Sequence, residues 1–260
     1  MKTAGQVENE RWQGIDVSKD PAARMYELRN VTFEVDLRGI EDLDHWRNDI
    51  KPNLPWADDH FLERVGGEPL NPGVQWMHWP WGRSADRFRD EKEIFNHTYM
   101  ERLWPKYSRR TPEGKLPVVI PRDSRKYPSL DVRPNQGVAF SLGDLQDVVE
   151  LLVKEPSTRQ AWIPLFFPED TGYGDGGRKP CTLGYQFLVR HDRIHVWYPL
   201  RSCDLAHHLQ DDCYLAVRLM LWVLGQCRSY DRDRWGMISP GTYAMHMTSL
   251  HVFENDRKDL

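Results

Sequence analysis

The chain has 260 residues, enough for one large domain or two small ones. Hydrophobic residues make up 40% and charged residues 28%, and the formal net charge of −4 excludes a general attraction to nucleic acid or to an anionic membrane. The first 20 residues are polar, and no apolar run reaches the roughly 20 residues that cross a bilayer, so we expect neither a signal peptide nor a membrane span.

The four cysteines form no C-x-x-C pair, which argues against a zinc or redox motif: Cys181, Cys203, Cys213 and Cys227. We therefore expect no metal site and free thiols in a reducing cytoplasm, which is the host's cytoplasm if a phage encodes the chain.

Residues 1–24 predict a polar lead that precedes a single domain at 25–260. The alternating pattern of 25–37 predicts a strand, and 55–67 predict a short helix that two glycines close. Residues 68–140 are rich in proline and tryptophan and show little periodicity, which predicts a functional lid or an insertion.

The pattern is sharper from residue 141 onward. Helical spacing predicts a helix at 141–156, and the nearly all-apolar segment 211–227 predicts a buried helix. Strands are predicted at 160–167, 181–190, 193–202 and 242–254, with a tight turn at 191–192. Strands and helices do not alternate strictly, so the fold class is predicted to be α+β, with helices packed on one large mixed sheet.

Cys181 is the first candidate for chemistry. It follows a proline at the start of a strand, and Arg178 and Lys179 come just before it. Nearby cations favour the thiolate, which is the attacking form of cysteine. The other reading is a buried and inert thiol.

Several polar residues lie at strand ends. Arg201 and Ser202 end one predicted strand, Arg159 precedes another, and His251 lies in the last. An arginine fork suits a phosphate, and a hydroxyl adds a donor. The alternatives are a solvated arginine and a histidine that is satisfied within its strand.

Taken in order, these residues form a pattern: Arg159, Pro180-Cys181, Gln186, the R-S-x-D of 201–204, Asp212, and the S-L-H-x-F of 249–253. Over roughly residues 141–256 this pattern resembles the thymidylate synthase superfamily. The closest resemblance is to deoxycytidylate hydroxymethylases, in which the position of Asp212 is Asp instead of the Asn of a thymidylate synthase.

The resemblance implies a role for each motif. Cys181 would be the nucleophile, and Arg201, Ser202 and a neighbouring subunit's Arg159 would hold the phosphate. The family's second arginine is Gln160 here, and Arg178 could compensate for it. A residue of the Arg159 type that comes from the neighbouring subunit implies a homodimer.

Further roles follow from the same resemblance. Gln186 would steady the nucleotide, Asp204 would contact folate, and His251 would contact the sugar. Phe253 replaces the family's tyrosine, which leaves ribose and deoxyribose both open. The family's catalytic glutamate would be Glu63, with Glu68 and Asp59 as competitors, and Trp79 and Trp81 would stack on folate or pack as a lid.

Asp212 carries the substrate prediction. Cytosine offers an amino donor at N4 and an acceptor at N3, and a carboxyl group can accept from the first and, with one proton shared, bridge to the second. The adjacent Asp211 suits a first-turn charge at the start of the helix.

The resemblance therefore implies an enzyme that converts dCMP to 5-hydroxymethyl-dCMP with 5,10-methylenetetrahydrofolate and water. The expected partners are a pyrimidine nucleoside monophosphate, folate and a second copy of the chain, without membrane or direct nucleic-acid binding. CMP hydroxymethylation, C5 methylation of a cytidylate or uridylate, and a non-catalytic nucleotide-binding homologue stay open as alternatives.

Overall fold

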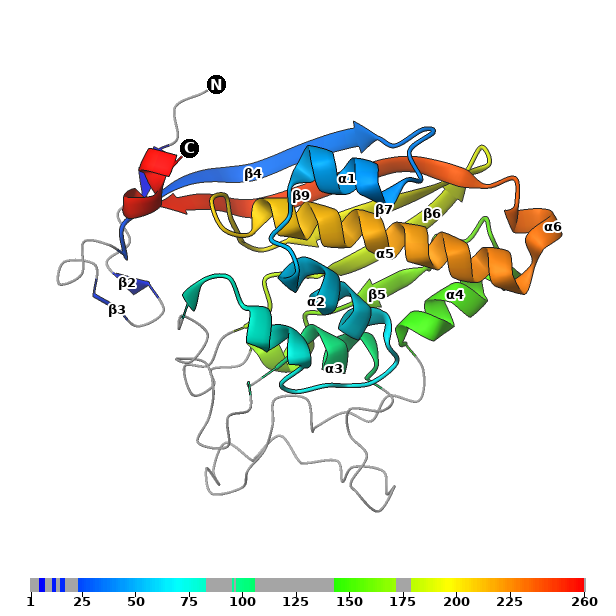
Figure 1. The fold of residues 1–260 in the computed structure, drawn as a ribbon, viewed down its shortest axis with the longest axis horizontal. Helices are drawn as coiled ribbons and strands as arrows, with labels where there is room; N and C mark the ends of the chain where they lie inside the picture. Colours follow the sequence, from blue (N-terminus) through cyan, green and yellow to red (C-terminus); the bar gives the residue numbers. More distant parts are fainter. Residues whose placement is uncertain are drawn as a thin grey trace, which may run out of the picture.

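The computed structural model describes residues 5–7, 11–12, 15–16, 23–82, 95, 97–105, 143–171 and 179–259. Within these residues the protein has two layers, a twisted sheet and a set of helices packed on it (Figure 1). No helix in these ranges is long and apolar enough to cross a membrane.

The sheet is mixed. Its strand order is β1 (Gly5–Val7), β4 (Met25–Asp36), β9 (Ser239–Phe253), β7 (Arg193–Leu200), β6 (Gly184–Arg190) and β5 (Trp162–Pro164). The two-residue strand β8 (Cys203–Asp204) adds to β9 beside β7. Strands β7 and β8 run parallel to β9, and the other pairs are antiparallel. A separate pair joins β2 (Arg11–Trp12) to β3 (Ile15–Asp16).

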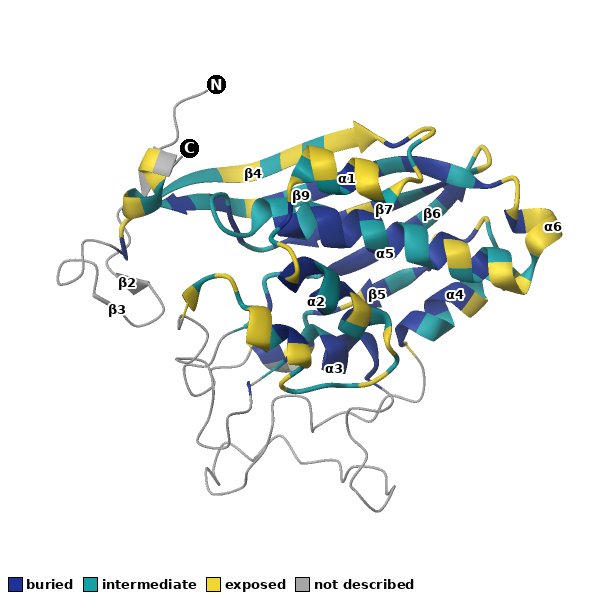
Figure 2. Ribbon diagram, viewed as in Figure 1, coloured by how far each residue is buried: buried dark blue, intermediate teal, exposed yellow. Residues whose placement is uncertain are grey.

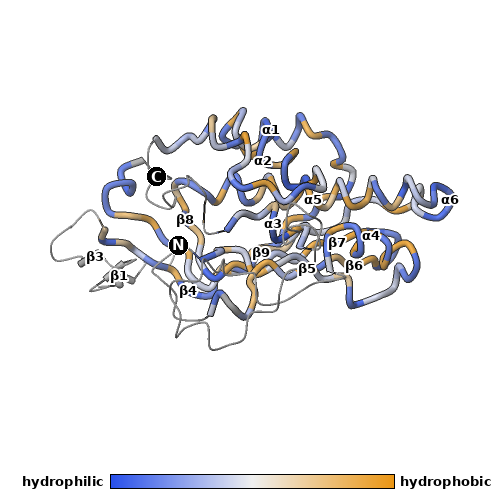
Figure 3. The backbone as a smooth tube through the Cα atoms, turned by 90° about the horizontal axis from the view of Figure 1, so that it is seen from below, coloured by the Kyte–Doolittle hydropathy of each residue, from blue (hydrophilic) through white to orange (hydrophobic). Residues whose placement is uncertain are grey.

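The described helices are α1 (Leu43–Ile50), α2 (Trp56–Val65), α3 (Tyr99–Leu103), α4 (Leu145–Lys154), α5 (Leu209–Tyr230) and α6 (Arg232–Trp235). The described residues also form three 3-10 turns, η2 (Val74–His78), η5 (Pro168–Thr171) and η6 (Glu254–Asp259). The view from below shows α1, α2 and α5 on one side of the sheet (Figure 3).

The α+β prediction, with helices on one large mixed sheet, is confirmed. Strand β4 and helix α2 match their predicted ranges closely, whereas α5 is longer than predicted and β5 is shorter. The predicted turn is a hairpin in which both His191 and Asp192 have a left-handed backbone, which matches the twist of the flanking strands. The cap of α4 is Asp144, whose side chain accepts from the backbone of Asp147.

One region differs from the prediction, and another lies mostly outside the described residues. Within the predicted lead at 1–24, strand β1 pairs with the start of β4. Most of the predicted lid at 68–140 lies outside the described residues, apart from 68–82, 95 and 97–105.

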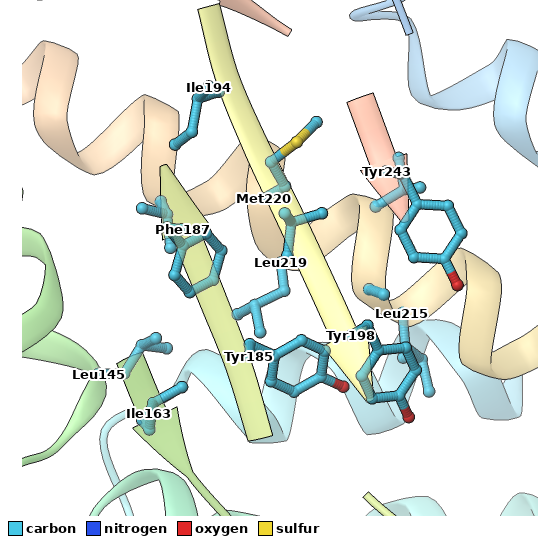
Figure 4. Close-up of a cluster of buried hydrophobic side chains, with 14 of the residues drawn as sticks. Leu145, Ile163, Tyr185, Phe187, Ile194, Tyr198, Leu215, Leu219, Met220 and Tyr243 are labelled. Atoms are coloured by element: carbon cyan, nitrogen blue, oxygen red, sulfur yellow. The ribbon is translucent and has the colours of Figure 1, made fainter. Parts of the chain in front are cut away.

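Buried and more exposed residues alternate along the strands of the sheet (Figure 2). On the face toward α5, side chains such as Phe187, Ile194 and Met220 form the core (Figure 4). Alternation along the strands sends Gln186 and Trp197 to the other face, where Trp197 is 41% exposed. We call this the open face, because none of the helices α1, α2 and α5 covers it.

Candidate active site

Cys181 lies in a short loop that enters β6, and backbone contacts fix it there. Its N–H donates to the hydroxyl of Tyr99 at 3.3 Å, and its carbonyl accepts from the N–H of Arg201 at 2.9 Å. The side chain is half-buried, and the guanidinium of Arg201 lies 4.0 Å from the sulfur. A partly exposed thiol beside a cation is the arrangement that a nucleophilic cysteine needs.

Arg201 also shapes this loop. Its Nε donates to the carbonyl of Pro180 at 2.8 Å, and its Nη2 donates to the carbonyl of Lys179 at 2.9 Å. These bonds use two of the five N–H groups of the guanidinium, so Arg201 holds the Cys181 loop against the end of β7. Its predicted contact with a phosphate would use its remaining N–H groups.

The next residues of the motif meet β9 side by side. Ser202 Oγ lies 3.3 Å from His251 Nδ1, and Asp204 pairs with His251 in the β8–β9 register. Burial lowers the pKa of His251, although the nearby carboxylates Asp204 and Glu27 oppose that effect. The imidazole is therefore neutral at neutral pH, as suits a hydrogen bond to a sugar hydroxyl.

Asp204 closes the turn before α5. One carboxylate oxygen accepts from the N–H groups of Ala206 (3.0 Å) and His207 (3.2 Å), and the other lies 3.0 Å from His207 Nδ1. These bonds position the start of α5, and the predicted contact with folate would add to this structural role.

The two adjacent acids at the start of α5 have different environments. Both oxygens of the buried Asp211 accept from Asn53, one from its N–H at 2.8 Å and one from its side-chain amide at 2.7 Å. Asp212 is half-buried and accepts from the hydroxyl of Tyr198 at 3.1 Å. Asp211 thus fastens α5 to the 51–55 loop, and Asp212 faces the sheet.

A chain of hydrogen bonds connects Asp212 to the nucleophile loop. Tyr198 lies 2.8 Å from the hydroxyl of Thr182, the residue after Cys181. The N–H of Thr182 donates to Tyr99, which also binds the N–H of Cys181. The structure therefore brings Asp212 and the loop of Cys181 into one hydrogen-bond network, and their roles in a shared site stay a prediction.

Burial raises the pKa of Asp212 to about 6, and Arg64 and the Tyr198 hydroxyl oppose the rise. Arg64 is buried on α2, where its Nε donates to His60 Nε2 at 3.1 Å and its Nη1 donates to the Tyr185 hydroxyl at 3.3 Å. In the described part of the chain, no carboxylate lies within ion-pair distance of Arg64. Both protonation states of Asp212 are thus accessible near neutral pH.

Sequence reasoning missed four members of this network: Tyr99, Thr182, Tyr198 and Arg64. One signal was available for Arg64. Residues 56, 60 and 64 repeat every four positions along α2, and Trp56 marks that stripe as buried. A charged side chain on a buried stripe indicates a site or an internal ion pair.

Comparisons with known proteins agree with this picture. No family model matches the chain. The chain is 23% identical over 155 residues to the thymidylate synthase of Francisella tularensis subsp. holarctica, covering 50% of this chain and 52% of that protein. It is 28% identical over 116 residues to a putative thymidylate synthase of Methanococcoides burtonii, covering 43% and 46%. The chain thus spans about half the length of the curated relatives it matches.

Among solved structures, the thermostable thymidylate synthase A from Bacillus subtilis superposes with a TM-score of 0.56 at 15% identity. The match covers 95% of this chain and 71% of that chain. The fold is that of thymidylate synthase.

On this thymidylate synthase fold, Glu63 lies at the junction of α2 and η2. One carboxylate oxygen accepts from the N–H of Gln75 at 2.9 Å, and the other is buried without a hydrogen-bond partner among the described residues. Burial raises the pKa of Glu63. Of its two competitors, Asp59 binds His78 at 2.6 Å, and Glu68 is exposed. No hydrogen bond between described residues joins Glu63 to Cys181 or Asp212, so its catalytic role stays a prediction.

Trp79 and Trp81 belong to an aromatic cluster between α2 and the turn before α5. Their ring centroids lie 4.5 Å apart, both rings meet Trp56 edge to face, and Trp81 lies 4.3 Å from His208. Both rings are only partly buried. Packing on Trp56 and His208 therefore accounts for part of these rings, and stacking on folate stays a prediction.

Gln186 and Arg159 lie on the other side of the sheet. The amide of Gln186 donates to the carbonyl of Arg159 at 3.0 Å, and Arg159 is exposed at the β5 edge. Gln186 points to the open face, away from its neighbour Tyr185. Arg178 lies outside the described residues, so nothing places its side chain. The described residues contain no group of three or more His, Cys, Asp or Glu that could hold a metal ion.

Proposed function

We propose that this protein is a folate-dependent pyrimidine nucleotide C5 hydroxymethyltransferase that converts dCMP to 5-hydroxymethyl-dCMP. The observation that carries the proposal is Asp212, a half-buried carboxyl with a pKa raised to about 6, hydrogen-bonded through Tyr198 and Thr182 to the loop of Cys181. A thiol and a base-reading carboxyl in one network suit covalent chemistry on a cytosine ring.

Cys181 starts the proposed reaction by adding its sulfur to C6 of the cytosine, which makes C5 nucleophilic. Arg201 keeps the loop of Cys181 in place for this attack through its bonds to Lys179 and Pro180. C5 then bonds to the one-carbon unit of the co-substrate and loses its proton, and tetrahydrofolate leaves, which gives an exocyclic methylene at C5. Hydroxide from water adds to that methylene, the C5–C6 double bond re-forms, and the sulfur of Cys181 leaves C6. Glu63, whose buried free oxygen has no partner among the described residues, is proposed to orient that water.

Asp212 selects the base. Its carboxyl accepts from the N4 amino group of cytosine, and one proton shared with N3 completes a two-point contact. A site that depends on such bonds rejects the wrong base by leaving buried polar groups unpaired.

The proposed co-substrate, 5,10-methylenetetrahydrofolate, supplies the one-carbon unit. The fit of this site to a flat heterocycle rests on Trp79 and Trp81, whose indole rings pack together beside the turn that Asp204 closes. Aromatic faces of this kind stack on planar rings.

The open face supports a homodimer as part of the proposal. A sheet face that carries the exposed Trp197 ring near Trp162, with ring centroids 5.8 Å apart, is a surface that a second copy would bury. Arg159 lies at the edge of that face, where it would reach the phosphate in the partner's site. Trp197→Glu would then give a monomer in light scattering and lose activity, whereas an unchanged mass would contradict this interface.

Product mass decides the reaction. The protein is incubated with methylenetetrahydrofolate and dCMP, CMP or dUMP, and the nucleotide product is weighed. A gain of CH₂O supports hydroxymethylation, whereas a gain of CH₂ with formation of dihydrofolate gives methylation, as the names of the relatives would suggest. Preferred turnover of CMP would replace the deoxyribose assignment, and no turnover of any nucleotide would favour a binding protein.

Two variants test the residues. Cys181→Ala should lower turnover on the order of 10⁴-fold or more while the protein stays folded. Asp212→Asn should shift preference from dCMP toward dUMP, because an amide donates to O4 and accepts from N3–H. Unchanged turnover in Cys181→Ala would sink the covalent mechanism.

A further inference from the structure

Three groups in a row lead from the nucleophile loop to Asp212: the hydroxyls of Thr182 and Tyr198, and then the carboxyl itself. Thr182 is 1% exposed and Tyr198 is fully buried. The separations are 2.8 Å and 3.1 Å, both within normal hydrogen-bond range. Water is therefore excluded from the hydroxyls of Thr182 and Tyr198, so these hydroxyl protons can be donated only to neighbouring protein groups.

The direction of the row follows from counting protons. An ionised carboxylate can only accept, so the single proton of Tyr198 points to Asp212. Tyr198 keeps that proton, because burial and the charge of Asp212 raise its pKa well above the usual value. Thr182 must then donate to Tyr198. The order of donation is Thr182, Tyr198, Asp212.

The ring of Tyr198 is held rigidly. It stacks on Tyr185 with centroids 4.5 Å apart and an angle of 11° between the planes, and Figure 4 shows the two rings side by side with their hydroxyls pointing the same way. Arg64 holds the neighbouring hydroxyl of Tyr185. The Tyr198 donor therefore has a fixed position relative to the carboxyl.

The two oxygens of Asp212 are not equivalent. Oδ1 accepts the O–H of Tyr198, whereas the nearest donor to Oδ2 is the thiol of Cys203 at 3.8 Å, a much weaker partner. A strong donor at Oδ1 favours negative charge there. When the carboxyl takes up one proton, that proton is directed to Oδ2.

The described groups that face Asp212 are Arg64 from α2, Tyr185 from β6, Tyr198 from β7, Cys203 from β8, Tyr243 from β9, and Asp211 and Cys213 from α5. Among them, Tyr198 is the strong donor in direct contact. Cys203 stays a thiol, because burial raises its pKa. Arg64 acts on both oxygens through charge, so the difference between them depends on Tyr198.

We propose that Tyr198 is a positioning residue that sets base specificity, by keeping Oδ1 of Asp212 an acceptor and leaving Oδ2 to carry the shared proton. The inference rests on the proposed function. Cytosine needs an acceptor opposite N4 and a donor opposite N3, and uracil needs the two in the reverse order. A carboxyl whose proton can lie on either oxygen can match both bases. Uracil is rejected only if Oδ1 stays the acceptor and Oδ2 carries the proton.

Tyr198→Phe tests this role. We expect the ratio of kcat/KM for dCMP to kcat/KM for dUMP to fall about 10- to 100-fold, the factor that one hydrogen bond to a charged group supplies. The fall should come partly from a gain in dUMP turnover, which mere loss of packing would not produce. Calorimetric binding of dCMP and dUMP without folate should show the same change in ratio.

The matched control is Tyr243→Phe. Tyr243 is also a buried phenol on the helix-covered face, and its hydroxyl meets the sulfur of Met245 at 3.0 Å instead of Asp212. In Tyr243→Phe, the ratio of kcat/KM for dCMP to kcat/KM for dUMP should stay that of the wild type. If Tyr198→Phe does not fold, Thr182→Val removes the donor behind Tyr198 and should lower the ratio by a smaller factor.

Each outcome has one reading. A wild-type preference for dUMP overturns the proposed function and this inference together. A wild-type preference for dCMP whose ratio over dUMP is unchanged in Tyr198→Phe, or in Thr182→Val where that variant is the one measured, overturns the role of Tyr198 alone. A fall in ratio equal to that of Tyr243→Phe also overturns it.

Discussion

Two buried arginines lie in the helix layer, and their surroundings differ sharply. Arg102 on α3 donates to both oxygens of Asp170 at 2.6 and 2.8 Å and to the carbonyl of Leu165 at 2.7 Å. Arg64 on α2 contacts His60, the hydroxyl of Tyr185 and the ring of Tyr99, and it has a longer-range attraction to Asp212. Arg102 is in direct contact with its carboxylate, whereas the carboxyl that attracts Arg64 is Asp212 of the candidate site.

The difference separates structure from chemistry. A buried pair such as Arg102–Asp170 fixes the path of the chain, because removing either partner leaves a bare charge. A buried arginine without a contacting carboxylate contributes instead to the electrostatics of its surroundings, and here that means the ionisation of Asp212. Substitutions at the two sites should therefore change different properties.

Asp170→Asn should have the largest effect on stability, because it removes the carboxylate that contacts the buried guanidinium of Arg102. Arg102 would then have no contacting carboxylate, as Arg64 has none, and it would also lack the tyrosine contacts of Arg64. Breaking a fully buried pair by removing one charge costs about 3–5 kcal/mol of unfolding free energy. Urea unfolding at pH 7 measures the loss.

The control is Glu41→Gln, since Glu41 pairs with Arg228 at the surface and its loss should cost several times less. An Asp170→Asn variant no less stable than Glu41→Gln would remove the distinction between the two arginines.

Arg64→Met should change the candidate site more than stability. Arg64 holds the pKa of Asp212 down, so its removal should raise that pKa above its present value of about 6. A carboxyl resonance followed by NMR should titrate at higher pH, and the pH at which dCMP affinity changes should move up with it, with a several-fold change in affinity at pH 7.

The loss of unfolding free energy in Arg64→Met should be smaller than in Asp170→Asn. An Asp212 titration that stays in place would show that Arg64 is structural, like Arg102.

The sequence predicted the fold well where the pattern is local. The alternation of β4, the 191–192 hairpin and the apolar α5 each depend on neighbouring residues, and each is present. The pairing of β4 with β9 joins residues more than 200 positions apart, and no local pattern encodes such a pair. Helix α1 has one buried residue, Trp46, and its apolar periodicity was too weak to predict a helix.

The site divides in the same way. Short motifs led to Cys181, Arg201 and Asp212, which the structure joins in one network. Glu63 and Arg64 are neighbours in sequence, yet each residue turns a helix by about 100°, so they point to different surroundings. Which of the two faces the sheet depends on tertiary packing, and the sequence stripe at 56, 60 and 64 was the evidence for Arg64.

Asp212→Asn provides the most specific test, because it removes the carboxyl whose pKa Arg64 lowers. The folded-state pKa of about 6 lies above the value of about 3.9 for an unfolded aspartate. The folded state therefore binds the proton more tightly, so stability falls as pH rises from about 4 through 6 and stays lower above that range. Asn does not titrate, so Asp212→Asn should melt several degrees above the wild type at pH 8, because a rise of about two pKa units corresponds to about 3 kcal/mol. The advantage should shrink toward pH 4, where the wild-type carboxyl is protonated in both states. A difference in melting temperature that is constant from pH 4 to pH 8 would show that Asp212 has no raised pKa, and Arg64 would then face a carboxylate that is ionised over this whole range.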